Sequence, residues 1–128
     1  KARCCLASNA KDSDPQQIAR ALERADLLRF IDQIFCFQNI GAMKPSEQFF
    51  QKLLEQLGVD SSQVTMIGDD LHNDILGAER CSIKAIWVNP NQSAVPEGIR
   101  SIQSLTELLK APIKECLLKP TRSTGSGF

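Results

Sequence analysis

The sequence predicts a three-layer α/β fold, in which helices cover both faces of a parallel sheet. Short apolar runs alternate along the chain with segments whose apolar residues recur at helical spacing, and this alternation is typical of parallel strands joined by helical crossovers. Polar residues follow several of the apolar runs directly, as they do where strands end at a ligand-binding edge. The length of 128 residues and the apolar content of 42% suit one domain with one core.

The first half of the chain is expected to hold two strands and two helices. Residues 3–7 (RCCLA) form a short apolar run that predicts a strand. Asp14 and the proline after it are typical of a helix N-terminus, and apolar residues follow at helical spacing. Residues 34–40 predict the second strand. Residues 45–57 carry an apolar helical face and are followed by Gly58, a good C-terminal stop.

The second half repeats the alternation. Residues 64–67 predict a third strand, and a short helix is expected over residues 74–80. Residues 83–88 predict a fourth strand, after which residues 91–98 have the proline and glycine content of a loop. A last helix is expected to begin over residues 105–109. These elements predict a sheet of parallel strands with right-handed crossovers.

We expect residues 1–118 to form the core domain and residues 119–128 to be a disordered tail, because the tail is small and polar. Fifteen basic residues balance fifteen acidic ones, which gives no electrostatic case for nucleic acid or an anionic membrane. The five cysteines include no C-x-x-C pair, which argues against a zinc cluster and fits a reducing compartment. No run has the length of a membrane span or the form of a signal segment. The predicted location is the cytoplasm.

Three separate stretches place polar side chains where predicted strands end. The residues concerned are Ser8, Asn9, Lys44, Asp69, Asp70 and Asp74. In open α/β sheets ligands bind along this carboxyl edge. Carboxylates packed so densely repel one another and resist burial, so a cation is expected among them. Mg²⁺ prefers one or two carboxylates together with waters and a phosphate oxygen.

Each of these side chains also has an ordinary structural interpretation. Asp74 suits a solvated helix N-terminus, Lys44 suits a surface, and Ser8 and Asn9 suit turns. As functional residues, Lys44 would neutralise a phosphate and Ser8 would donate its hydroxyl to it. His72, between two of the aspartates, is interpreted as a surface residue in a loop.

The order of the three stretches resembles the haloacid dehalogenase-like (HAD) superfamily of hydrolases, most of which are phosphatases. CLASN is similar to the second motif of that family, GAMKPSEQFF to the third and VTMIGDDLHNDILGA to the fourth. IKAIWVNP resembles the strand that follows, so the resemblance covers about residues 2–92. It implies a Rossmann-like sheet and a Mg²⁺-dependent phosphatase that acts on a small phosphorylated metabolite through an aspartyl-phosphate.

The resemblance also implies a role for each polar residue. The phosphate-binding residues would be Ser8, Asn9 and Lys44. The metal-binding residues would be Asp69, Asp70 and Asp74, with Asp69 in direct contact with Mg²⁺. Lys44, Asp69 and Asp74 would be the catalytic residues.

The chain departs from the family at the first motif, an Asp-x-Asp after an N-terminal strand, whose first aspartate is the nucleophile. No Asp-x-Asp follows an apolar run here, and KDSD at residues 11–14 is interpreted as helix capping. In family members the missing strand lies between those bearing the second and fourth motifs. We therefore expect a gap in the sheet between residues 3–7 and 64–67, with unpaired backbone groups on both sides. The hypothesis is an incomplete chain, inactive alone, that an N-terminal segment or a partner strand complements.

Two other functions stay open. A degenerate, non-catalytic relative could bind Mg²⁺ or a partner protein, whose strand would pair with the exposed sheet positions. A receiver-type phospho-acceptor domain also uses paired acids, a hydroxyl and Lys-Pro, but there the acids come first and Lys-Pro last, the reverse of the order here. A dinucleotide-binding fold is excluded because no Gly-x-Gly-x-x-Gly follows a strand.

Overall fold

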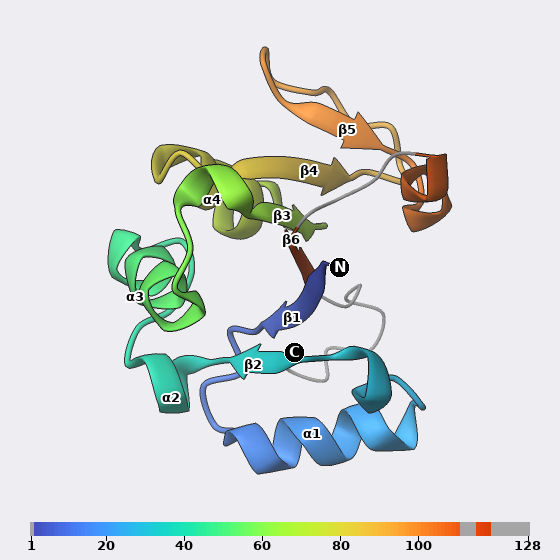
Figure 1. The fold of residues 1–128 in the computed structure, drawn as a ribbon. Coiled ribbons are helices and arrows are strands. Elements are labelled where there is room, and N and C mark those ends of the chain that lie inside the picture. The colour runs from blue at the N-terminus through green and yellow to red at the C-terminus, as the bar shows by residue number, and fades with distance from the viewer. Residues whose placement is uncertain (1, 111–114, 119–128) are drawn as a thin grey trace.

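In a computed structural model of the chain, six parallel strands form one sheet in the order β2-β1-β6-β3-β4-β5 (Figure 1). The structure describes residues 2–110 and 115–118, with the backbone alone for residues 109, 110 and 115–118. The strands are β1 (Arg3–Ala7), β2 (Gln33–Phe35), β3 (Thr65–Gly68), β4 (Lys84–Val88), β5 (Arg100–Ile102) and β6 (Glu115–Leu118). The predicted class, α/β with a parallel Rossmann-like sheet, is confirmed.

The helices begin and end where local capping chemistry places them. The α-helices are α1 (Pro15–Arg24), α2 (Phe37–Ile40), α3 (Glu47–Leu57) and α4 (Gly77–Arg80); η3 (Leu71–Leu76) is a π-helical segment, and η1 (Leu28–Phe30), η2 (Ser61–Gln63) and η4 (Leu105–Lys110) are 3₁₀ turns. Asp14 caps α1 by accepting from the Gln17 amide at 2.8 Å. Gly58 ends α3 in a left-handed conformation, φ +68°. Within the described residues, none of these helices has the length and apolarity needed to cross a bilayer.

Apolar side chains pack on both faces of the sheet. On one face, residues of α3 pack with alternate residues of the central strands; this cluster includes Phe49, Phe50, Leu53, Cys5, Ala7 and Met66. On the other face the described side chains form two clusters, one under α1 around Leu6, Ile18 and Leu22, and one along β3, β4 and β5 around Ile67, Ile86 and Ile102. Figure 1 shows α1 and the α3–α4 pair as separate layers around the strands.

Two predicted element boundaries are wrong. The strand predicted over residues 34–40 stops at Phe35, because the Asn39 side chain accepts from the Cys36 amide at 2.8 Å and starts the short helix α2. The helix predicted over residues 74–80 starts earlier, at Leu71, because the Asp70 carboxylate accepts from the Asn73 amide at 3.0 Å and caps η3.

The predicted gap in the sheet is also wrong, because β6 fills it. This strand lies parallel between β1 and β3, and Cys116 is the register partner of both Cys4 and Thr65. The backbone rows expected to be unpaired are therefore paired through β6. Neither β5 nor β6 is predicted by the sequence pattern, and the tail predicted over residues 119–128 lies outside the described residues.

Candidate active site

A buried ion pair lies at the carboxyl edge of the sheet. Lys44 Nζ donates to Asp74 Oδ1 at 2.8 Å and to the Ala7 carbonyl oxygen, at the end of β1, at 2.7 Å. Both charged side chains are 0% exposed. Two charges this deeply buried are tolerated when they are paired and further hydrogen-bonded, as they are here. The structure therefore brings together two of the predicted site residues.

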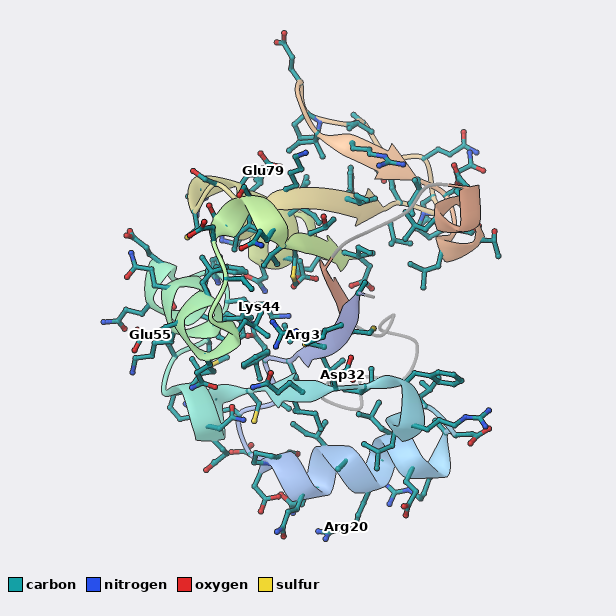
Figure 2. All side chains as sticks on the ribbon, viewed as in Figure 1. Arg3, Arg20, Asp32, Lys44, Glu55 and Glu79 are labelled. Carbon is teal, nitrogen blue, oxygen red and sulfur yellow. The ribbon has the colours of Figure 1, made fainter. Side chains whose placement is uncertain are left out.

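The Asn9 side chain positions this lysine by hydrogen bonding to the backbone of Lys44. Its Oδ1 accepts from the Lys44 amide at 2.9 Å, and its Nδ2 donates to the Lys44 carbonyl at 3.1 Å. Both polar atoms of the Asn9 side chain are thus engaged by one residue. Figure 2 shows Lys44 between α3 and β1, and the Lys44–Pro45 peptide bond is cis. A phosphate-binding role for Asn9 stays a prediction, whereas its contact with Lys44 is a finding that sequence reasoning missed.

Ser8 lies directly after β1 and is completely buried. Its amide donates to the Phe35 carbonyl at 2.8 Å, which continues the β1–β2 pairing by one residue. Its Oγ accepts from the Ala10 amide at 3.0 Å, so the hydroxyl proton is still available for donation to another acceptor. The turn interpretation of Ser8 describes these contacts, and its predicted phosphate role would use the remaining proton.

The first two aspartates lie next to the ion pair, because the Asp70 amide donates to Asp74 Oδ2 at 3.3 Å. Asp69 and Asp70 follow β3 and are half-buried. Asp70 accepts from the Asn73 amide and from Asn73 Nδ2, at 3.0 and 3.1 Å. The Asp69 carbonyl accepts from the Trp87 indole Nε1 at 3.1 Å, a contact that fixes the turn after β3. Sequence reasoning missed Trp87, although the β3–β4 register places it opposite Gly68.

The donor set fits a hard cation held largely by water. Asp69 and Asp70 supply two neighbouring carboxylates, which suits Mg²⁺. The third aspartate, Asp74, instead neutralises Lys44. Among the described residues no group of three histidine, cysteine or acidic side chains is found that could hold a metal ion, and the metal-binding role of the three aspartates stays a prediction. His72 is exposed, in agreement with its interpretation as a surface residue.

Gly68 lets Asp74 approach the end of β3. A Cβ atom added to Gly68 would lie 2.7 Å from Asp74 Cγ and 2.8 Å from Asp74 Cβ. Real side chains do not pack this closely, so the backbone at this position has room only for glycine. The glycine before the paired acids thus has a packing role in the ion pair as well as ending the strand.

Comparison with known proteins assigns the arrangement to a family. The model of the haloacid dehalogenase-like hydrolase family matches residues 7–88, well over half of the 128 residues. The chain belongs to this family. The match runs from the end of β1 to the end of β4, and it includes every predicted site residue.

Individual relatives agree with this assignment. The chain is 30% identical over 101 residues to the pyrimidine 5′-nucleotidase PynA of Streptococcus pneumoniae, which covers 73% of this chain and 43% of that protein. A HAD phosphatase structure from Thermococcus onnurineus superposes with a TM-score of 0.66 at 30% identity, over 75% of this chain and 45% of that one. The magnesium-bound structure of the putative HAD-hydrolase YfnB from Bacillus subtilis gives 0.67 at 25% identity, over 77% and 44%. The chain thus spans less than half the length of these relatives.

Proposed function

We propose that this chain forms part of a cytoplasmic, Mg²⁺-dependent phosphatase that acts on a small phosphorylated metabolite. The observation that carries the proposal is the position of the Lys44 ammonium. It donates to the carbonyl oxygen of Ala7, which precedes Ser8 at the end of β1, and it pairs with Asp74, which follows β3 in the chain. A fixed cation and a hydroxyl at a sheet edge, together with carboxylates that suit Mg²⁺, are what phosphoryl transfer requires. A nucleotidase and a HAD phosphatase among the relatives support the same reaction class.

Each residue would act through the contacts described above. Ser8 would give its hydroxyl proton to a phosphoryl oxygen, and Lys44 would stabilise the negative charge of the transferred group. Asn9 would keep Lys44 in place through its two backbone hydrogen bonds. Asp69 and Asp70 would hold Mg²⁺, which when bound supplies positive charge to the phosphoryl group. The magnesium in the YfnB structure supports the choice of ion.

The proposed reaction also needs a nucleophilic aspartate. No Asp-x-Asp follows an apolar run in these 128 residues, so the nucleophile would come from a segment outside this chain. We therefore expect no turnover by the chain alone, and activity only with a complementing N-terminal segment. This expectation is supported by the alignments, in which the chain covers under half of the length of each of these relatives.

A non-catalytic module is the second candidate, and one observation favours it. Strand β6 fills the centre of the sheet from within the chain, so the fold closes without a partner. Such a module would keep the Mg²⁺ site or a protein-interaction surface and lack turnover under every condition.

Two measurements test the phosphatase proposal. Hydrolysis of p-nitrophenyl phosphate with Mg²⁺ is measured for the chain alone and for the chain mixed with the N-terminal half of a family relative such as the nucleotidase. We expect no rate alone, a rate for the mixture, and loss of that rate in Asp69→Asn. Turnover by the chain alone that disappears in Asp69→Asn would overturn the predicted inactivity, and failure of every mixture would favour the non-catalytic module.

Mg²⁺ binding is measured separately by calorimetry. We expect Asp69→Asn to weaken it at least about tenfold, since one of two carboxylate ligands is lost. Asp26→Asn is the matched control, because Asp26 is an exposed aspartate that follows the C-terminal end of α1 and not the end of a strand. Equal Mg²⁺ affinity in the two variants would remove Asp69 as a ligand.

A further inference from the structure

We propose that β6 is an exchangeable strand. It occupies a slot between β1 and β3 that also accepts an extended apolar segment delivered in trans, parallel to both neighbours. The strand would thereby act as a built-in competitor of that segment. If β6 is exchangeable, it regulates assembly of the phosphatase, and this consequence rests on the proposed function.

The slot is a complete strand position with hydrogen-bonding partners on both sides. β6 pairs in parallel with β1 over four residue pairs and with β3 over three. It ends with Leu118 in register with Leu6 and Ile67, just before Ser8 and Asp69 follow their strands. An occupant of this slot therefore runs toward the candidate active site.

The strand that fills the slot comes from outside the family match. The matched residues, 7–88, include β3 and β4 and reach back to the end of β1, whereas β6 begins at Glu115. The central strand of this sheet is therefore supplied by a part of the chain that the family model does not describe. The family model thus describes β3 and the end of β1, which flank the slot, but it does not describe β6, which fills the slot.

The path of the chain also sets β6 apart. β5, the preceding strand, lies at the edge of the sheet, and β4 and β3 lie between it and β6 in the strand order. Strands that follow one another in sequence are usually neighbours in a sheet. Among the described residues no strand follows β6. β6 can therefore leave the slot without moving any of the other described strands out of the sheet.

The walls of the slot select an apolar, extended occupant. Leu6 on β1 and Met66 and Ile67 on β3 are at most 1% exposed. On the face under α1, the cluster around Leu6 lies on one side of the slot and the cluster around Ile67 lies on the other. An occupant with apolar side chains on both faces would be buried as a strand of a doubly covered parallel sheet is. Pairing of this kind is strand addition, with backbone hydrogen bonds giving affinity.

The consequence is competition for one position. While β6 is in the slot, a complementing strand cannot enter it, so the C-terminal segment inhibits assembly of the proposed phosphatase. Covalently fixing β6 should then block any incoming strand, and releasing it should restore entry.

The chain contains its own means of fixing β6. Cys4 and Cys116 are register partners in β1 and β6. Neighbouring strands lie about 4.8 Å apart, and this separation lies within the Cα spacing that a disulfide accepts. Mild oxidation of the whole chain with copper phenanthroline should give an intrachain Cys4–Cys116 disulfide, mapped by peptide mass spectrometry and absent in Cys116→Ser. Failure to form it would show that β6 does not sit in the slot, and would overturn the proposal.

The exchange itself is tested with a fluorescent peptide, APIKESLLKP, which is residues 111–120 with serine in place of Cys116. Binding is followed by anisotropy with the reduced chain, with the oxidised chain and with a scrambled peptide. We expect saturable binding to the reduced chain and at least about tenfold weaker binding to the oxidised one. Equal binding to both forms would place the peptide elsewhere, and no binding to the reduced form at millimolar peptide would make β6 a permanent strand; either result overturns the proposal. Neither readout uses phosphatase activity, so a failed complementation assay and a failed strand exchange remain separate results.

Discussion

Replacing Lys44 with methionine removes the cation from a pocket in which Asp74 has no access to solvent. The Lys44 and Asp74 side chains are both 0% exposed, and the ammonium contacts Asp74 at 2.8 Å. In Lys44→Met the Asp74 carboxylate would keep the Asp70 amide, at 3.3 Å, as the hydrogen bond described for it. Breaking a buried ion pair from one side costs about 3–5 kcal/mol, because the buried charge that stays behind loses its counter-ion.

The loss is large compared with the total stability of such a domain. Single domains unfold with about 5–15 kcal/mol, so Lys44→Met should lose about a fifth or more of its stability. At this chain length the midpoint of thermal unfolding should fall by about 10–20 °C. Urea denaturation followed by the fluorescence of the single tryptophan, Trp87, gives the free energy directly.

A double variant separates charge from packing. Because Asp74→Asn removes the charge that Lys44→Met leaves unpaired, the double variant should recover at least about 1 kcal/mol relative to the sum of the two single losses. Lys52→Met is the matched control, since Lys52 also donates to a backbone carbonyl, that of Ile40 at 3.3 Å, but is exposed. It should change stability by about 0.5 kcal/mol or less. A loss below about 1 kcal/mol in Lys44→Met would refute the reasoning, because it would mean that water reaches the pair.

Three further predictions follow from local geometry. Gly68→Ala should cost about 1–3 kcal/mol by urea denaturation, because the new methyl group would overlap the Asp74 side chain, and an unchanged midpoint would contradict the packing. Asp14→Ala removes the cap of α1 and should cost about 1 kcal/mol, whereas a neutral result would show that the cap is not formed. Burial and, to a lesser extent, the Glu47 carboxylate raise the pKa of the Cys81 thiol. The pH profile of its alkylation should therefore lie above that of the urea-unfolded chain, and the stability that this thiol contributes should be lost as pH rises through its folded pKa; a profile at or below the unfolded one would contradict this.

The strand ends could be predicted from the sequence, and the side-chain contacts at them could not. An apolar run followed by Ser8 or by Asp69 identifies a carboxyl edge, because parallel strands all end on the same side of a sheet. The pattern gives no indication that Asp74 would pair with Lys44. That choice depends on Gly68 leaving space and on Ala7 offering its carbonyl, which are both features of tertiary packing.

The boundary errors have the same physical origin. Residues 34–40 read as one apolar run, and hydrophobicity alone does not distinguish a strand from a short helix over so few residues. The Asn39 side chain decides the outcome by capping the backbone at Cys36, and Gly41 ends the turn with φ +81°. Asp70 does the same for η3. In both places one polar side chain that hydrogen-bonds the nearby backbone outweighs the apolar pattern.

Strand β6 shows that the absence of one family strand from a sequence does not predict an unfilled position in the sheet. The sequence shows no Asp-x-Asp after an apolar run, but the predicted gap in the sheet does not follow from this. Two buried rows of backbone amides and carbonyls would each cost free energy if left unpaired, so a sheet with β1 and β3 in place favours any extended segment that can reach between them. Glu115–Leu118 (ECLL) holds no β-branched or aromatic residue, so the sequence pattern does not mark it as a strand, yet it is paired on both sides. The two neighbours therefore specify the slot more strongly than they specify its occupant, and this is the physical condition for one strand to replace another.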